Sequence, residues 1–457
     1  MRQFVLKANE EVLLWISTGV PCAVTYTIQS REIQIPKYLL EHLLRNYPMI
    51  GCVLYVERVK ICSRRWKAMA VRKIKEGIYE VGAIDWDRRL FDELIPLPDG
   101  TSYNSYLVVG KEKIALIDTV DPSKERVLIE NIEKLNIERI DYIVSNHAEQ
   151  DHSGSIPVIL EMFPDSKVVT NPKAKEFLMD LLHVPEERFL LINEGETLDL
   201  GGRTLKFFMT PWVHWPETMV TYLVEDRILF TCDFFGSHLA TSKLFADEEV
   251  LEPAKRYYAE IMMPFRVSIK NHLKKLENLD IEMIAPSHGP IYRDPSFIMN
   301  AYKDWTSDDV KNEVVVAYVS MHGSTEALVR RFVDILVEKG VEVKLFNLTK
   351  ADIGEYAISL VDCATLVIAS PTVLTGLHPV VSFVASLTGA LRPKLRYVGF
   401  LGSYGWGGRA FDQLKSLLTG LRSEFLDPFI IKGHPTEKDF EKLEEFAEEI
   451  LSRHERL

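Results

Sequence analysis

The residues best suited to chemistry lie close together in the segment Asn146-His-Ala-Glu-Gln-Asp-His-Ser-Gly154. Four metal-ligand types fall within six residues of this segment: His147, Glu149, Asp151 and His152. A single histidine is usually a packed or surface residue, but four ligand types in so short a window indicate a metal site. The segment directly follows residues 140–145, whose β-branched content predicts a buried strand.

Three further ligand-type side chains stand near the ends of later predicted strands: His214, Asp233 and His288. Loops at the carboxyl ends of strands can converge on one site. Seven candidates are too many for one tetrahedral ion, but they suit two adjacent metals that share a ligand. Imidazoles and carboxylates without a thiolate favour iron, manganese or zinc over copper(I).

Three loops in the last third of the chain have the composition of phosphate-binding and ring-binding segments. Ser320-Met-His-Gly-Ser-Thr325 precedes a predicted helix, whose unpaired backbone amides favour a phosphate. It lacks the Gly-Lys-Ser/Thr of a triphosphate loop. The loops 370–376 and 402–408 follow the next two predicted strands, and Tyr404 and Trp406 can flank a flat ring. Alternatively, these aromatic side chains pack on the surface and the glycines only form turns.

The elements that must position the first set of loops alternate between strands and helices. A hairpin is predicted over 103–118 and helices over 122–135 and 249–279. Further strands are predicted at 77–82, 140–145, 204–209, 219–224, 227–231 and 281–285. This pattern suggests two sheets with helices outside them.

The alternation after residue 314 is more regular. Strands are predicted at 314–319, 341–346, 365–369, 397–401 and 429–431, with helices at 325–338, 353–360, 380–387, 410–418 and 437–451. Strands that alternate with helices predict a doubly wound parallel sheet, in which ligands bind beyond the carboxyl ends of the strands. We expect the domain boundary in the polar stretch 304–312.

Residues 1–68 differ from the rest, with ten Lys or Arg against five Asp or Glu. We treat them as an N-terminal extension of uncertain order, either an appendage or a small partner-docking module. The 457-residue chain carries a net charge of −12, which argues against non-specific nucleic-acid binding, and its apolar runs are too short to span a membrane. Its five cysteines form no Cys-x-x-Cys pair, which excludes rubredoxin-like modules and suits the cytoplasm.

The pattern His-x-Glu-x-Asp-His with later His, Asp and His resembles the metallo-β-lactamase superfamily. Hydrolases of that superfamily usually carry His where this chain has Glu149, and the Glu variant resembles the flavodiiron proteins. The loops after residue 314 resemble those of flavodoxin, an FMN carrier. The resemblance implies an α/β fold: an N-terminal extension (1–68), an αββα metallo-β-lactamase-like sandwich (69–310) and a flavodoxin-like doubly wound sheet (311–457).

The resemblance also implies the ligands. One iron would be held by His147, Glu149 and His214, the other by Asp151, His152 and His288, and Asp233 would bridge them. The FMN phosphate would lie against Ser320, Met321, His322, Gly323, Ser324 and Thr325. The flavin ring would lie against Thr372, Val373, Leu374, Thr375, Gly376, Ser403, Tyr404, Gly405, Trp406, Gly407 and Gly408.

By the same resemblance the chain is an oxidoreductase that reduces O2 to water, NO to N2O, or both. Electrons would pass through FMN from an external carrier such as rubredoxin, and a head-to-tail homodimer, or a dimer of dimers, would bring flavin and iron together. One alternative is a metal-dependent hydrolase with an accessory flavodoxin domain, which Glu149 disfavours. Another is an electron carrier with a structural metal.

Four positions carry more specific expectations. Many family members have a histidine in the segment resembling 84–92, where this chain has Asp92 or a neighbour; this difference leaves the seven ligands intact but does not let the resemblance assign a substrate preference. The loop 373–375 lacks an aromatic that many flavodoxins stack on the ring. Tyr257 or Tyr258 can supply a phenol near the metals or simply pack. Cys232 should point away from Asp233, because side chains alternate along a strand.

Overall fold

The structure is a computed structural model that describes residues 5–6, 14–15 and 71–457. The strands β1 (Val5–Leu6) and β2 (Leu14–Trp15) pair antiparallel. The rest of the predicted extension lies outside the described residues. Among the helices of the described part, none is both long and apolar enough to cross a bilayer.

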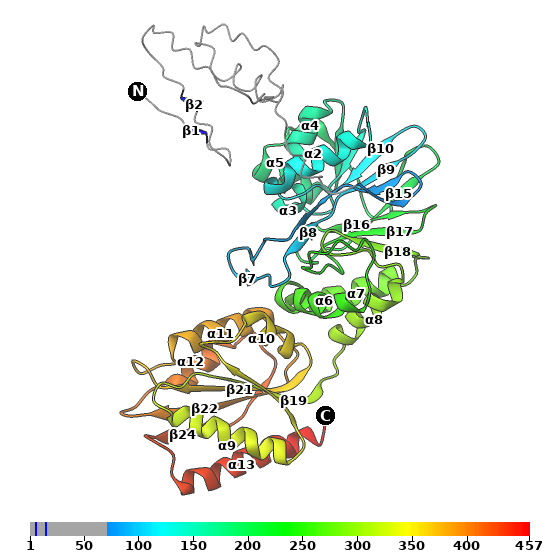
Figure 1. Ribbon diagram of the computed structural model, residues 1–457. Coiled ribbons are helices and arrows are strands. Elements are labelled where there is room, and N and C mark those ends of the chain that lie inside the picture. Colours follow the sequence, from blue (N-terminus) through cyan, green and yellow to red (C-terminus); the bar gives the residue numbers. More distant parts are fainter. Residues whose placement is uncertain (1–4, 7–13, 16–70) are drawn as a thin grey trace. The chain divides into compact units, whose positions relative to one another are not determined.

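The first large sheet has seven strands in the order β13-β12-β11-β10-β9-β4-β3. Figure 1 labels its strands β9 and β10. The strands β10 to β13 run parallel, and β3, β4, β9 and β10 pair antiparallel. Their bounds are β3 (Arg72–Lys75), β4 (Ile78–Glu80), β9 (Tyr106–Val109), β10 (Ile114–Ile117), β11 (Tyr142–Val144), β12 (Lys167–Thr170) and β13 (Phe189–Leu191). Two small ribbons lie beside it: β5 (Ala83–Asp85) with β8 (Thr101–Tyr103), and β6 (Leu90–Phe91) with β7 (Ile95–Pro96).

The second sheet has five strands in chain order: β14 (Thr197–Asp199), β15 (Thr204–Met209), β16 (Met219–Leu223), β17 (Ile228–Cys232) and β18 (Met283–Pro286). The helices on the first sheet are η1 (Pro122–Lys124), α2 (Glu125–Lys134), α3 (Gln150–Ser153), α4 (Ile156–Met162), α5 (Pro172–Leu182) and η2 (Glu186–Arg188). Those on the second are η3 (Glu248–Val250), α6 (Leu251–Tyr257), the π-helical turn η4 (Tyr258–Met262), η5 (Met263–Phe265), α7 (Arg266–Leu276) and α8 (Pro295–Thr306).

Side-chain alternation along the strands explains the layers. On β15, Leu205 and Phe207 lie in the core between the two sheets, whereas Phe208 packs in the core under α6 to α8. The outer face of the first sheet packs against α2, α4 and α5 through side chains such as Leu128 and Ile159. This is the predicted αββα sandwich, and its two sheets bring the carboxyl ends of β10, β11, β17 and β18 to one region.

The last third of the chain is the predicted doubly wound sheet. Its main strands run parallel in the order β20-β19-β21-β22-β24, with the short β23 also beside β22. The strands are β19 (Lys311–Tyr318), β20 (Glu342–Asn347), β21 (Cys363–Pro371), β22 (Tyr397–Tyr404), β23 (Glu424–Phe425) and β24 (Phe429–Lys432). The helices are α9 (Ser324–Glu338), α10 (Ile353–Leu360), α11 (Pro379–Leu391), α12 (Ala410–Leu417) and α13 (Glu437–His454).

Helices cover both faces of this sheet. On β19, Val314 and Val316 pack with α9 and α13, whereas Val315 and Ala317 face the other core, which α10 to α12 share. The strand order reverses between β19 and β21, and ligands of such sheets bind beyond the carboxyl ends of the strands at that point.

Candidate metal centre and flavin pocket

The loop that carries the first four predicted ligands begins where β11 ends and runs into α3. Asn146 fixes its start, because its backbone N–H and its side-chain amide each donate to the carboxylate of Asp118 at 2.8 Å. The helix α3 then contributes Asp151 and His152, both buried, and His147 is buried just before it. The close spacing in the sequence therefore becomes close spacing in space.

Two groups of ligand-type atoms form around Asp233. In the first group, Glu149 Oε2 lies 3.1 Å from His147 Nε2 and 3.0 Å from His214 Nε2. Asp233 Oδ2 lies 3.4 Å from each of these two imidazole nitrogens. These four ligand atoms all lie within 4.8 Å of one another.

The second group lies on the other oxygen of the same carboxylate. Asp151 Oδ2 lies 3.3 Å from His152 Nε2 and 3.2 Å from His288 Nε2. Asp233 Oδ1 lies 2.9 Å from His152 Nε2 and 3.5 Å from His288 Nε2. The structure thus brings all seven predicted side chains together, with one oxygen of Asp233 toward each group.

The tautomers of two histidines show that these groups suit cations. His288 Nδ1 donates to the backbone oxygen of Ser102 at 2.7 Å, so in the neutral ring Nε2 carries a lone pair. That nitrogen is buried without a hydrogen-bond partner, as are both carboxylate oxygens of Asp151 facing it. His147 Nδ1 likewise lies 2.7 Å from Glu217 Oε1, which leaves Nε2 toward the first group. Lone pairs that face carboxylates without a cation repel, so the donor set fits two metal ions.

The carboxylates compensate for the burial of the imidazoles. Burial lowers the pKa of His214, but hydrogen bonds to Asp233 and Glu149 outweigh it and raise that pKa to about 9. Burial also lowers the pKa of His147, but hydrogen bonds to Glu149 and Glu217 outweigh this effect and raise that pKa well above its usual value. Protons and metal ions compete for the same nitrogens, so metal binding here releases protons.

Cys232 shows where the alternation argument is wrong. The pairing of β17 with β18 has a bulge between Phe230 and Cys232, and Cys232 has φ +51°, in the left-handed region. Its sulfur lies within 4.8 Å of ligand atoms of His152 and Asp233 instead of pointing away from them. The side chain is buried as expected, and burial raises the pKa of the thiol well above its usual value.

The structure distinguishes the two candidate tyrosines. The hydroxyl of Tyr257 donates to Asp233 Oδ1 at 2.7 Å, whereas that of Tyr258 donates to the backbone oxygen of Trp305 at 3.3 Å. Tyr257 ends α6 and Tyr258 begins the π-helical turn, so successive side chains leave the helix in different directions. The phenol of Tyr257 orients the carboxylate shared by the two groups.

Two residues beside the centre, Glu217 and His238, were not singled out from the sequence, and a third, Asp92, was named without a defined role. Glu217 stands three residues after His214, and its carboxylate contacts His147 Nδ1. The two residues are 70 positions apart, so no sequence pattern indicates this contact. His238 is buried, with Nδ1 at 2.9 Å from Thr101 Oγ1 and its ring 4.8 Å from that of His288. Asp92 is on the loop between β6 and β7; partial burial and the nearby Glu149 raise its pKa to about 6.

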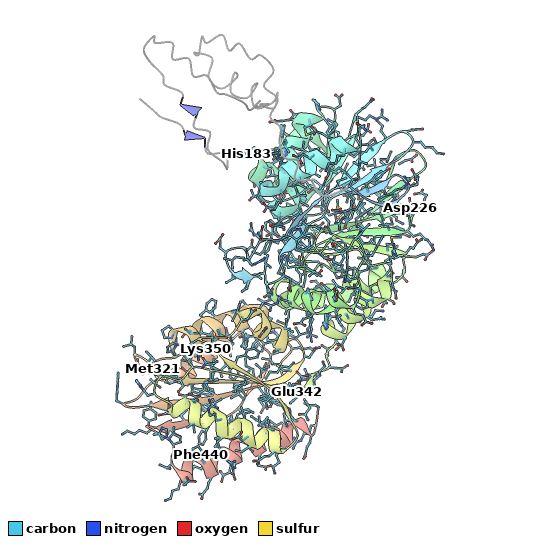
Figure 2. All side chains as sticks on the ribbon, in the orientation of Figure 1. His183, Asp226, Met321, Glu342, Lys350 and Phe440 are labelled. Atoms are coloured by element: carbon cyan, nitrogen blue, oxygen red, sulfur yellow. The ribbon has the colours of Figure 1, made fainter. Side chains whose placement is uncertain are left out.

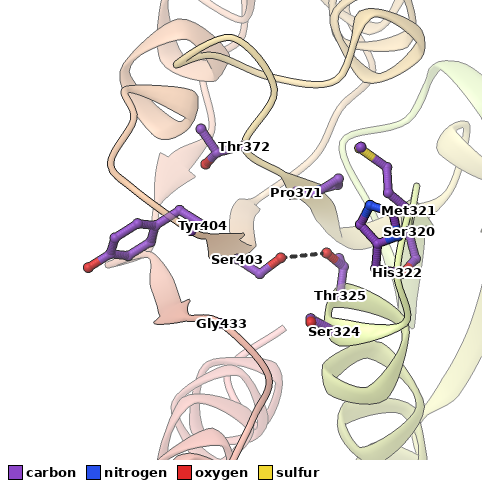
Figure 3. A pocket seen from close by; sticks show the side chains of 11 residues that line it. Ser320, Met321, His322, Ser324, Thr325, Pro371, Thr372, Ser403, Tyr404 and Gly433 are labelled. Carbon is purple, nitrogen blue, oxygen red and sulfur yellow. Dashed lines mark hydrogen bonds between the residues drawn. The ribbon is translucent and has the colours of Figure 1, made fainter.

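The predicted phosphate and ring loops meet in a cavity of about 170 Å³ in the last domain (Figure 3). Its lining includes predicted residues from all three loops: Ser320, Met321, His322, Ser324, Thr325, Thr372, Ser403, Tyr404 and Gly405. Pro371 and Gly433 complete the lining. The other predicted positions lie outside it: Gly323, Val373, Leu374, Thr375, Gly376, Trp406, Gly407 and Gly408.

The start of α9 suits a phosphate. Ser320 Oγ accepts from the backbone N–H groups of Gly323 and Glu326, at 3.2 Å each. The first-turn amides of Ser324 and Thr325 donate to no acceptor among the described residues. Gly323 has φ +86°, and a Cβ there would meet no atom within 4 Å, so this loop borders open space. The hydroxyls, free amides and open volume fit the phosphate end of FMN.

Two family models match the chain. One is described as ODP family beta lactamase and matches residues 101–289. The other is described as flavodoxin and matches residues 316–446.

Proteins of known name resemble almost the whole described chain. It is 36% identical over 391 residues to a nitric oxide reductase of Moorella thermoacetica, which covers 83% of this chain and 98% of that protein. The solved rubredoxin oxygen:oxidoreductase of Desulfovibrio gigas aligns with TM-score 0.81 and 30% identity over 84% of this chain and 99% of that one. The flavodiiron protein of Giardia intestinalis aligns with TM-score 0.77 and 27% identity over 85% and 98%.

Proposed function

Because the chain belongs to the flavodiiron protein family, we propose that it reduces O2 to water, NO to N2O, or both. Its cofactors are FMN and a di-iron centre. The names of its relatives support both substrates, since one is a nitric oxide reductase and another an oxygen oxidoreductase. The observation that carries the proposal is the carboxylate of Asp233, whose two oxygens face two separate groups of ligand atoms.

We assign the metal ligands accordingly. His147, Glu149 and His214 would hold one iron, and Asp151, His152 and His288 would hold the other. Asp233, whose two oxygens face the two groups, would be shared by both irons and would offset the repulsion between two cations. The three carboxylates would lower the net charge of the centre and so favour the higher oxidation states of iron, and the four imidazoles would bind as neutral ligands.

When bound, the iron pair and reduced FMN would together supply the electrons that reduce the diatomic molecule, two from each. Reduction of O2 to two waters consumes four electrons and four protons, and reduction of two NO to N2O and water consumes two of each. The residues around the ligands orient the ligand side chains and fix which ring nitrogen of a histidine carries the proton. Glu217 fixes the tautomer of His147, the backbone oxygen of Ser102 fixes that of His288, and the Tyr257 hydroxyl donates to the bridging carboxylate.

We assign the FMN phosphate to residues 320–325 and the flavin ring to residues 372–376 and 403–408. The cavity supports this assignment for the predicted residues that line it, namely 320–322, 324–325, 372 and 403–405. Trp406 and Leu374 are 76% and 88% exposed, so neither is committed to packing within the described chain. They are free to contact a flavin or a second subunit.

We propose an external electron donor and a dimer. A carrier such as rubredoxin fits the name of the Desulfovibrio gigas relative, and the given sequence contains no Cys-x-x-Cys pair. A head-to-tail homodimer, alone or paired in a dimer of dimers, would cover apolar surfaces at both sites. Besides the exposed residues of the flavin loops, Trp212 beside the metal loop is 50% exposed. Sedimentation of the intact protein tests this assembly, and a monomer would contradict it.

We propose the domain division 69–310 and 311–457, since α8 ends at Thr306 and β19 begins at Lys311. We also propose a cytoplasmic location. The two described cysteines, Cys232 and Cys363, are free and buried, which suits a reducing compartment.

The test of the function is gas consumption by the intact protein after anaerobic loading with iron and FMN. With reduced rubredoxin as donor, we expect consumption of O2, NO or both, and loss of this activity in Asp233→Ala. Absence of either activity in a protein that holds both cofactors would contradict the proposal. A sample that contains only zinc and hydrolyses an ester or lactam would favour the hydrolase instead.

A further inference from the structure

A fourth loop, outside the three predicted ones, reaches the flavin cavity. It follows β24 and begins with Gly433 and His434. Gly433 lines the cavity, and its N–H donates to the backbone oxygen of Tyr404 at 2.9 Å. Its φ of +79° lies in the region that favours glycine, and a Cβ there would meet nothing within 4 Å. This turn places the next residue at the rim.

His434 contacts the phosphate end of the cavity. Its Nδ1 lies 3.4 Å from the hydroxyl of Ser324, the first residue of α9. Figure 3 shows Ser324 and His322 on the α9 side of the cavity and Gly433 on the other side. The contact is long for a hydrogen bond, so neither side chain is saturated by the other. Both can turn toward a third group between them.

The charge balance of the cavity explains why an imidazole matters there. A phosphomonoester carries a charge of about −2 at neutral pH. The described residues that line the cavity include hydroxyls, backbone amides and His322, but no Lys or Arg. The α9 amides supply partial positive charge on one side only. An imidazole N–H at the opposite rim is the complement that this arrangement lacks.

We propose that His434 binds the phosphate of FMN, so that the chain distinguishes FMN from riboflavin through a residue of its last loop. This inference rests on the proposed FMN site. If His434 only contacted Ser324 and did not bind the phosphate, replacing His434 would change the affinities for FMN and riboflavin equally.

The test compares FMN and riboflavin on the full chain after flavin removal, with quenching of flavin fluorescence as the readout. His434→Ala should weaken FMN binding about tenfold, which is the effect of losing one hydrogen bond to a charged group. Riboflavin binding should not change. His434→Gln, which keeps a side-chain donor, should lose less FMN affinity than His434→Ala.

The matched control is His183→Ala, which removes an exposed-loop imidazole from the end of α5 in the first large domain (Figure 2). It should leave both affinities unchanged. Equal FMN affinity in His434→Ala and the parent protein, or an equal loss for both flavins, would overturn the role of His434. Failure of the parent protein to bind FMN would instead overturn the proposed FMN site.

Discussion

Glu260 is a buried carboxyl whose replacement should stabilise the protein, by an amount that depends on pH. It lies in the π-helical turn η4, where the Arg256 guanidinium is 3.5 Å away but already bonded to Asp352. Both carboxylate oxygens of Glu260 are buried without a hydrogen bond. Burial outweighs the attraction of Arg256 and raises the pKa of Glu260 from 4.5 to about 8.

The sign of the effect follows from proton linkage. Between pH 4.5 and 8 the folded state holds a proton that the unfolded state has lost, so folding becomes less favourable as pH rises. Glu260→Gln keeps the shape and removes the titration. At about 1.4 kcal/mol per pH unit, the stabilisation by Glu260→Gln should grow by about 3 kcal/mol from pH 5.5 to 8.

The assay is urea-induced unfolding of the FMN-loaded protein, followed by tryptophan fluorescence, at both pH values. Glu445→Gln, on the exposed face of α13, is the matched control and should show no such change. If Glu260 were instead an ionised partner of Arg256, its replacement would destabilise the protein at pH 8 by several kcal/mol. A destabilised variant, or a stabilisation that does not change with pH, would therefore refute the reasoning.

Three further changes test other parts of the structure. Asp233→Ala should lose the iron pair yet retain FMN, as measured by metal and flavin analysis of one sample; two irons per chain would contradict the bridge. His454→Gln should reduce the loss of thermal stability, measured as the melting temperature, that the parent protein shows when the pH is lowered from 7 to 5. Burial lowers the pKa of His454 in the folded state, so the parent protein loses stability as pH falls below 6.5, and an unchanged difference between pH 7 and 5 would count against this. Gly354→Ala should destabilise by about 1–3 kcal/mol, although alanine normally favours a helix, because its Cβ would lie 1.8 Å from Arg256 Nη1; a rise in the urea midpoint would be the opposite result.

The parts of the molecule that follow regular periodicity were predictable from sequence. β15 and α10 have the bounds that their residue patterns predict, 204–209 and 353–360. Strand β12 was not predicted, because its apolar run is very short. Helix α5 was also not predicted; it begins at Pro172, directly after that strand. The parallel pairing of β19 with β21 is also the one expected for a doubly wound sheet of alternating strands and helices.

The candidate site was predictable where its residues are of metal-ligand types and follow strands. The exceptions have local geometric causes. At Cys232 a bulge and a left-handed backbone reverse the expected side-chain direction. Glu217 and His434 act through contacts with residues 70 and 110 positions away, and such distances leave no pattern in a single sequence.

The most direct test of the di-iron centre is anomalous X-ray diffraction at the iron absorption edge, from crystals of protein loaded without air. Two peaks should flank the carboxylate of Asp233, one beside His147 and His214 and one beside His152 and His288. A single peak, or iron bound elsewhere in the chain, would contradict the shared dinuclear site.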